Sequence, residues 1–292
     1  MTHKSFLFFG TPYVARDTLA FLLSHGYRPE VVITSPDAPK GRGQVLTPCE
    51  TKVYAEEQGL PVLTPEQVNE TFIDSLQKYD ASYAIVVAYG KILPQKLIDA
   101  FPLGILNIHY SLLPQYRGAS PVETALLSDD TETGVSIQQM VYALDAGDVL
   151  AHTSLSIEPE ETTRELRPRL IALGSELLVT TLPAFEAGTL TRMPQDHTQA
   201  THTRKIPKEA GALSLTDDAR SNWNKYRAYA ESPGTYFFMK KEDARIRVKI
   251  RTATYTPGTF TPLRVVPEGK NETDYTALLA QGFIPVDPAS TT

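Results

Sequence analysis

The stretch Tyr83-Ala84-Ile85-Val86-Val87-Ala88-Tyr89-Gly90 decides the fold of this chain. Its central residues, 85–88, are all apolar, which is typical of a β-strand that is covered on both faces. Leu7-Phe8-Phe9, near the start of the chain, has the same character. We therefore expect these two segments to be strands near the centre of one sheet.

Further β-rich runs lie on both sides of this stretch, and segments of helical character separate them. They are EVVITS (30–35), PVLT (61–64), GILNIHY (104–110), GVSIQQMV (134–141) and DVLAHTSLSI (148–157). This alternation predicts an α/β fold with a mostly parallel, Rossmann-like sheet. A long helix should follow Thr162 or Thr163 and end at about Glu186, and Pro168 should either kink it or delay its start.

The length of 292 residues allows a second, smaller domain, because single cores usually stop growing before about 250 to 300 residues. Residues 188–207 contain Pro, Gly, Thr, His and Gln with little periodicity, so we expect a linker at 191–207. The α/β domain then occupies 1–190. A small β-rich domain, with strands in TYFFMK and RIRVKIRTATY, occupies 208–292.

The composition narrows the classes of protein to consider. The hydrophobic fraction of 41% and the charged fraction of 21% are near the averages for soluble globular chains. No run reaches the roughly 20 apolar residues of a membrane span, and the single cysteine, Cys49, cannot form an internal disulfide. We expect a cytoplasmic protein, neither secreted nor membrane-inserted. The net charge of −6 argues against nucleic-acid binding by the whole surface, so any RNA contact should be local.

Polar residues that suit catalysis lie within the run GILNIHY. Asn107 and His109 lie two residues apart in a β-type segment, so their side chains share one face of the strand, at the sheet edge where ligands usually bind. Asp145, in the loop 142–148 between two predicted strands, is the expected partner of His109. The three suit addition to a carbonyl, because two donors stabilise an oxyanion while the carboxylate orients the imidazole and favours its protonated form. The alternatives are a structural histidine and a solvated turn aspartate.

Other chemistries find less support. Ser111 lacks the Gly-x-Ser-x-Gly turn of serine hydrolases, and Cys49 has no motif of a thiol nucleophile. Phe9-Gly10-Thr11-Pro12 supplies one glycine of the three in the dinucleotide fingerprint, so we expect no nicotinamide cofactor. That turn either holds an anion at a helix start or only reverses the strand. His197 and His202 have no ligand cluster around them, so we expect no metal.

The motifs Asn107-Ile108-His109, Ser111-Leu112-Leu113-Pro114 and Asp145-Ala146-Gly147 resemble those of the folate-dependent formyltransferase superfamily. Within it, the members that act on methionyl-tRNA are most similar. Four further segments carry that likeness: Phe9 to Pro12, Ser35-Pro36-Asp37 with Gly41-Arg42-Gly43, Val86 to Gly90, and Ser232-Pro233-Gly234. The resemblance extends from about residue 4 to residue 240.

This resemblance implies a reaction and its participants. N10-formyltetrahydrofolate is the donor and a consumed co-substrate, the α-amine of initiator methionyl-tRNA is the acceptor, and no metal takes part. Asn107, His109 and Asp145 inherit the catalytic roles. The small domain is implied to be an OB-like tRNA-binding domain, and we expect a monomer. The residues implied to lie near the folate are Tyr89, Gly90, Ser111, Leu112, Leu113 and Pro114.

The chain departs from the superfamily pattern in two places. Tyr110 stands where the superfamily usually has Gly, and we expect its bulk to tighten the folate or acceptor side of the cleft. The small domain looks truncated, as though strands between Thr259 and Leu263 were lost, which puts a closed five-stranded barrel in question.

Two basic segments are the expected tRNA contacts. The loop 36–48 holds Lys40, Arg42 and three prolines and predicts a semi-rigid arm, the alternative being an ordinary surface loop. In RIRVKIR, strict alternation places four cations on one face of a strand: Arg245, Arg247, Lys249 and Arg251. The alternative for these is an edge strand protected by charge.

Three other functions stay open. The same catalytic residues would serve a formyltransferase that acts on an amino sugar nucleotide or on a purine precursor. A noncatalytic RNA-binding protein on this scaffold is a third possibility, against which the presence of Asn107, His109 and Asp145 speaks.

Overall fold

The structure is a computed structural model that describes residues 3–41 and 43–288. It consists of two compact units, each built from several segments of the chain. The first runs to Gly118 and adds Gly134–Leu155 and Pro168–His202. The second comprises Ala119–Thr133, Ser156–Arg167 and the described residues from Thr203 onward.

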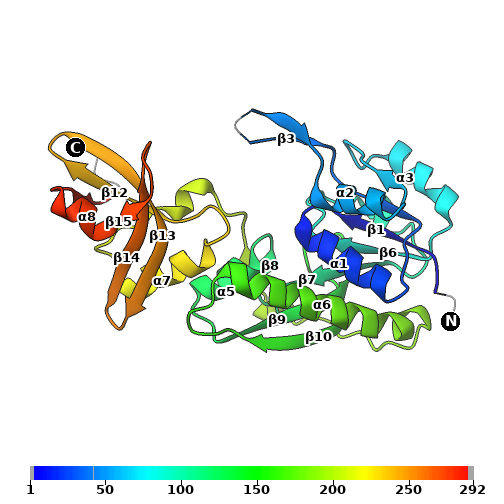
Figure 1. Cartoon of the computed structure of the whole chain (residues 1–292). Helices are drawn as coiled ribbons and strands as arrows, with labels where there is room; N and C mark the ends of the chain where they lie inside the picture. Colours follow the sequence, from blue (N-terminus) through cyan, green and yellow to red (C-terminus); the bar gives the residue numbers. More distant parts are fainter. Residues whose placement is uncertain (1–2, 42, 289–292) are drawn as a thin grey trace. The chain divides into compact units, whose positions relative to one another are not determined.

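A seven-stranded sheet, counted over the described residues, forms the centre of the first unit (Figure 1). Its order is β10 (Val149–Ser156), β9 (Glu132–Gln139), β7 (Ile105–His109), β6 (Tyr83–Val87), β1 (Phe6–Gly10), β2 (Val31–Ile33) and β5 (Val62–Leu63). Every run expected as a strand of this sheet forms one. β1 and β6 lie near the centre of this order, so the prediction of two strands near the centre of one sheet is confirmed, and they are also parallel neighbours, with Phe8 opposite Ile85.

Helices cover both faces of this sheet. Leu7 and Phe9 pack in a buried cluster with residues of α3 (Glu70–Leu76) and α4 (Gln95–Ile98). On the other face lie α1 (Tyr13–Ser24) and α6 (Thr163–Glu186), which meet where the Ser175 hydroxyl donates to Thr18 Oγ1 at 3.3 Å. The helix α2 (Glu50–Glu57) completes the unit.

The helix α6 begins at Thr163 and contains Pro168, so a later start is wrong. Gly10, at the end of β1, has no room for a side chain, because a Cβ would lie 2.4 Å from that of Ala15 and 3.0 Å from the Val87 carbonyl oxygen. Close packing of β1 against α1 and β6 therefore explains this glycine without an anion.

The second unit is built on an antiparallel sheet, with five strands among the described residues. The order is β15 (Thr273–Asp274), β14 (Thr259–Pro267), β13 (Ala244–Thr256), β12 (Tyr236–Lys241) and β16 (Ile284–Val286). Its helices are α5 (Pro121–Leu127), α7 (Ala219–Ala228) and α8 (Tyr275–Ala280). The expected β-rich domain is confirmed. Within the described residues β15 and β16 end the ladder on opposite sides, and Thr259 to Leu263 belongs to β14.

Short elements complete the chain. They are β3 (Ala38–Lys40), β4 (Val45–Thr47), β8 (Arg117–Gly118), β11 (His202–Thr203) and the 3-10 turns at Gln77–Tyr79, His197–Gln199 and Lys208–Gly211. Across the described residues, no helix combines the length and the apolar character that crossing a bilayer requires.

Candidate active site

Asn107 and His109 lie on β7, which pairs with β6 on one side and β9 on the other. Their side chains alternate with Ile108 and Tyr110, which contact the opposite layer. A Cβ placed on Gly174 of α6 would lie 3.1 Å from Ile108 and 3.5 Å from the Tyr110 ring. The Tyr110 ring therefore lies next to α6, on the opposite side of the sheet from Asn107 and His109. The expectation that its bulk tightens the cleft is wrong, because residue 110 continues the alternation of the strand.

The structure brings His109 and Asp145 together. Nδ1 of His109 lies 3.6 Å from Oδ2 of Asp145, and the two side chains are only 6% and 12% exposed. The other ring nitrogen, Nε2, lies 2.9 Å from the carbonyl oxygen of Tyr116. Both nitrogens thus face acceptors, and a protonated ring has an N–H for each of them.

Three backbone and side-chain features fix the carboxylate of Asp145. The Gly118 N–H donates to Oδ2 at 2.7 Å, and the Gln138 side-chain amide donates to Oδ1 at 2.9 Å. Asp145 itself has φ = 47°, in the left-handed region, which Asp adopts more readily than most residues. Position 147 has room only for glycine, because a Cβ there would lie 1.7 Å from the carbonyl oxygen of Gln139. The loop has little freedom to place this carboxylate elsewhere.

The side-chain amide of Asn107 makes no hydrogen bond to any residue in the described part of the chain, and Asn107 is only partly buried. Its N–H groups are therefore available to a ligand on the face that carries His109. A free amide donor and an imidazole on one strand face, with a carboxylate beside the imidazole, can stabilise negative charge on a carbonyl oxygen under attack.

The residues expected near the folate line the turns that follow β6 and β7. The ring of Tyr89 packs edge-on against Phe9 in the core, its centroid 5.4 Å away, and burial raises the pKa of Tyr89 to about 12. Gly90 has φ = 81° and begins the turn. Ser111 uses its hydroxyl within the second turn, donating to the Gln115 carbonyl at 2.5 Å. At these positions a ligand would meet polar groups of the backbone more than polar groups of side chains.

Leu112 and the cis peptide Leu113-Pro114 complete that second turn. The side chain of Leu112 fills the space above Gly134, where a Cβ would lie 2.5 Å from it. The Leu113 N–H donates to Ser136 Oγ at 3.1 Å, which ties the turn to β9.

The loop 36–48 forms a hairpin of β3 and β4, with Lys40 Nζ 3.0 Å from Glu50 Oε1. Val45 and Leu46 are 66% and 68% exposed. Arg42 lies outside the described residues.

The four cations of RIRVKIR lie on β13. Arg245, Lys249 and Arg251 are exposed, while Val248 and Ile250 between them are buried in the core. β13 pairs with both β12 and β14, so it is an interior strand. Lys249 is paired on both sides, opposite Tyr236 and Val266, so edge protection does not account for its charge, whereas Arg245 lies beyond the register of β14 and pairs with β12 alone.

Two buried polar residues next to the Asp145 loop were not predicted from the sequence. Arg117 and Gln195 are 5% and 8% exposed, and the guanidinium donates to Gln195 Oε1 from Nε at 3.1 Å and from Nη2 at 2.7 Å. Gln195 lies in the segment expected as a linker. A single buried amide in a polar, aperiodic segment leaves no pattern in the sequence.

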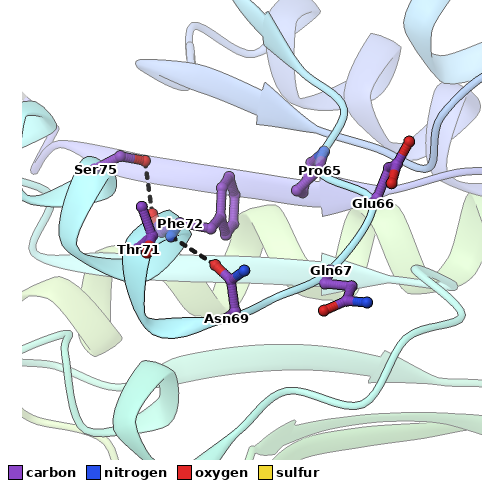
Figure 2. Close-up of a pocket in the computed structure, with 7 residues that line it drawn as sticks. All are labelled: Pro65, Glu66, Gln67, Asn69, Thr71, Phe72 and Ser75. Carbon is purple, nitrogen blue, oxygen red and sulfur yellow. Dashed lines mark hydrogen bonds between the residues drawn. The ribbon is translucent and has the colours of Figure 1, made fainter.

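An open depression of about 560 Å³ lies elsewhere in the first unit (Figure 2). The Asn69 side-chain oxygen accepts the N–H of Phe72, and the Ser75 hydroxyl donates to the Phe72 carbonyl, so both side chains are bonded to α3. Lys91 donates to the carbonyls of Pro65 and Glu66. Two of the polar side chains that line the depression are thus occupied by hydrogen bonds to Phe72.

Comparison with known proteins agrees with the fold and the site. Residues 4–182 match the family described as Formyl transferase. Methionyl-tRNA formyltransferase of Geobacter metallireducens is 38% identical over 88% of this chain and 84% of its own length. The protein of the same name from Thermotoga neapolitana is 39% identical over 82% of this chain and 77% of its own length.

Two solved structures share the fold at low identity. An N-formyltransferase from Helicobacter canadensis, in complex with folinic acid and dTDP-3-aminofucose, has a TM-score of 0.62 and 16% identity over 93% of this chain and 98% of that chain. Glycinamide ribonucleotide transformylase 1 from Symbiobacterium toebii has a TM-score of 0.56 and 19% identity over 66% and 95%. The family match and the identity over most of the chain show that this protein belongs to the formyl transferase family and, within it, to the methionyl-tRNA formyltransferases.

Proposed function

We propose that this protein transfers the formyl group of N10-formyltetrahydrofolate to the α-amine of initiator methionyl-tRNA, with Asn107, His109 and Asp145 as its catalytic residues. The observation that carries the proposal is the free amide of Asn107 on the strand face of His109, whose ring lies 3.6 Å from Asp145. A carbonyl carbon attacked by an amine needs this kind of donor set.

The reaction proceeds by addition and elimination at the formyl carbon. The methionyl amine forms the new C–N bond, and the formyl oxygen takes the negative charge. Asn107 donates a hydrogen bond to this oxygen, and the positive charge of protonated His109 stabilises it, while Asp145 holds the ring. The bond to N10 then breaks, N10 takes up a proton, and the new amide nitrogen loses one. No covalent enzyme intermediate is needed.

The acceptor follows from the relatives. The proteins named for methionyl-tRNA are 38% and 39% identical over most of the chain. The amino sugar and glycinamide ribonucleotide enzymes share only the fold, at 16% and 19% identity. Formyl transfer to those acceptors is therefore the second candidate. Binding of RNA without catalysis is the third, and the free donor on Asn107 argues against it.

The tRNA would be held by two basic surfaces, one on each unit. We assign residues 1–190 to catalysis and 208–292 to tRNA binding, with the connection at 191–207. Lys40 and Arg42 belong to the first surface, and Arg245, Arg247, Lys249 and Arg251 to the second. Tyr236 and Phe238 lie opposite Lys249 and Arg247 in the register of β12 and β13, so aromatic rings flank the cations. Such mixed surfaces suit RNA.

The product of this reaction is used in translation initiation, and we infer a cytoplasmic location on that ground. The turns after β6 and β7, with Tyr89, Gly90 and Ser111 to Pro114, are the expected place of the folate. We propose that the protein acts as a monomer.

The test is an acceptor comparison. Purified protein is given N10-formyltetrahydrofolate with charged initiator tRNA, with an amino sugar nucleotide, or with glycinamide ribonucleotide. We expect formylation of methionyl-tRNA to exceed the others by orders of magnitude. Faster transfer to either small acceptor would refute the assignment, and absence of transfer to all three would favour the noncatalytic reading.

A further inference from the structure

The side chain of Gln195 bridges Arg117 and the loop of Asp145. Its amide nitrogen donates to the carbonyl oxygens of Asp145 at 2.9 Å and Gly147 at 2.6 Å. Its oxygen accepts both bonds from the Arg117 guanidinium. Every polar atom of this buried amide thus has a partner, and the two ends face different parts of the site.

We propose that Gln195 is a positioning residue for catalysis: it fixes the main chain on both sides of Ala146 and so keeps the Asp145 carboxylate against His109. This inference rests on the proposed function, because it assumes that Asp145 acts through His109. Gln195 thus has a positioning role although it lies in the segment 191–207, which the sequence predicts to be a linker.

The loop needs such a restraint. Asp145 occupies the left-handed region, which costs free energy for a residue with a side chain and persists only where the surroundings enforce it. Gly118 holds the carboxylate from one side, since its N–H bonds Oδ2. Gln195, which accepts hydrogen bonds from Arg117, bonds the main chain of the loop from the other side. The dipeptide Arg117-Gly118 therefore positions Asp145 both directly and through Gln195.

Glutamine is the side chain that this place requires. The two loop carbonyls need a donor, and the guanidinium needs an acceptor, and an amide supplies both. In Gln195→Glu the oxygen that faces Arg117 remains, but the donor becomes a carboxylate oxygen directed at two carbonyl oxygens. The substitution therefore breaks the half of the bridge that reaches Asp145 and keeps the half that reaches Arg117.

The experiment is a double-mutant cycle on formylation of methionyl-tRNA, with Gln195→Glu, Asp145→Ala and the combined variant. Gln199→Glu, an exposed glutamine of the same segment, is the matched control. Because displacement by about 1 Å costs up to about 100-fold, we expect Gln195→Glu to lower kcat about 10- to 100-fold. The KM for methionyl-tRNA should stay within about twofold, since ground-state contacts to the acceptor are unchanged. Gln199→Glu should match wild type.

The combined variant separates positioning from a structural role. If Gln195 acts through Asp145, adding Gln195→Glu to Asp145→Ala causes no further loss of kcat. A further loss of about tenfold would overturn the inference, as would a single Gln195→Glu variant with kcat within about twofold of wild type. Should Gln195→Glu fail to fold, Gln195→Met, neutral and of similar length, replaces it in the same cycle.

Failure of the proposed function gives a different result. In that case wild type forms no formyl-methionyl-tRNA, or Asp145→Ala alone leaves turnover unchanged. An inactive Asp145→Ala beside a fully active Gln195→Glu rejects only the role of Gln195.

Discussion

Nδ1 of His109 lies 3.6 Å from Oδ2 of Asp145, although the strand β9 separates the two residues along the chain. The same Oδ2 accepts the N–H of Gly118 at 2.7 Å, so the protein's own backbone directs the carboxylate. Preorganised groups of this kind cost no rearrangement when charge develops in the transition state. The pair and the free amide of Asn107 lead to the first prediction.

Replacing Asn107 or His109 by Ala should lower kcat for formylation about 100- to 1,000-fold each, because each removes one group that stabilises the oxyanion. Binding of the folate, measured by fluorescence titration, should change little. His152→Ala is the control, since His152 is exposed on β10. Turnover of His109→Ala near that of the control would rule out the assigned role.

Much of this arrangement follows from the sequence. The apolar residues 85–88 predicted a central strand because both faces had to be buried, and the spacing of Asn107 and His109 predicted a shared face. Asp145 was paired with His109 because loops at strand ends converge. Each of these inferences uses a periodicity or an end of a strand, which neighbouring residues reveal.

The contacts missed from the sequence have no such period. Gln195 bonds the backbone of Asp145 and Gly147, and any residue has a backbone carbonyl, so no side-chain pattern points to the bond. The direction of Tyr110 follows from the alternation along its strand, which a comparison with the glycine of the superfamily pattern does not show. The interior place of β13 depends on pairing with β12 and β14, which only the three-dimensional ladder shows.

Two buried tyrosines should respond oppositely to loss of their hydroxyls. Tyr83 donates to Glu186 at 2.9 Å, so Tyr83→Phe should lower the free energy of unfolding by about 1.5 to 3 kcal/mol at pH 8. The Tyr89 hydroxyl has no hydrogen-bond partner within the described residues. Tyr89→Phe should therefore be neutral or stabilising, because it removes a buried polar group that is not bonded. Urea denaturation of both variants measures the difference.

Alkaline pH adds a signed test for Tyr89. Burial raises the pKa of Tyr89 to about 12, above the ordinary value of about 10 that it regains on unfolding. The neutral Tyr89 hydroxyl contributes fully to the free energy of unfolding below pH 10, and this contribution is lost as the pH rises from about 10 to about 12. Relative to wild type, Tyr89→Phe should thus gain about 1 kcal/mol between pH 8 and pH 11. A constant difference across this range would show that the hydroxyl is not shielded as the structure indicates.

The hairpin of β3 and β4 is predicted to contact the acceptor end of the tRNA. Arg42→Ala should raise the KM for methionyl-tRNA about tenfold, since a charged contact to phosphate or sugar is lost, and should leave the KM for the folate unchanged. Arg28→Ala serves as a control, because Arg28 bonds the carbonyls of Gln58 and Gly59 away from the hairpin. Equal KM values for wild type and Arg42→Ala would mean that the hairpin is an ordinary surface loop.

The cations of β13 should determine how this acidic protein holds tRNA. Neutralised phosphates release counterions, so Arg247→Gln with Lys249→Gln should weaken binding and make the logarithmic salt slope shallower by up to about one unit per lost contact. The matched control is Arg264→Gln on β14, whose guanidinium already pairs with Glu272 at 2.9 Å and Asp274 at 2.7 Å and has less charge to offer a phosphate. Arg247 has a weaker competitor, Glu268 at 3.7 Å. Affinity measured by filter binding from about 50 to 200 mM salt gives both slopes. Because Lys249 is paired with both β12 and β14, edge protection cannot account for its charge, and an unchanged slope in the double variant would show that the tRNA binds elsewhere.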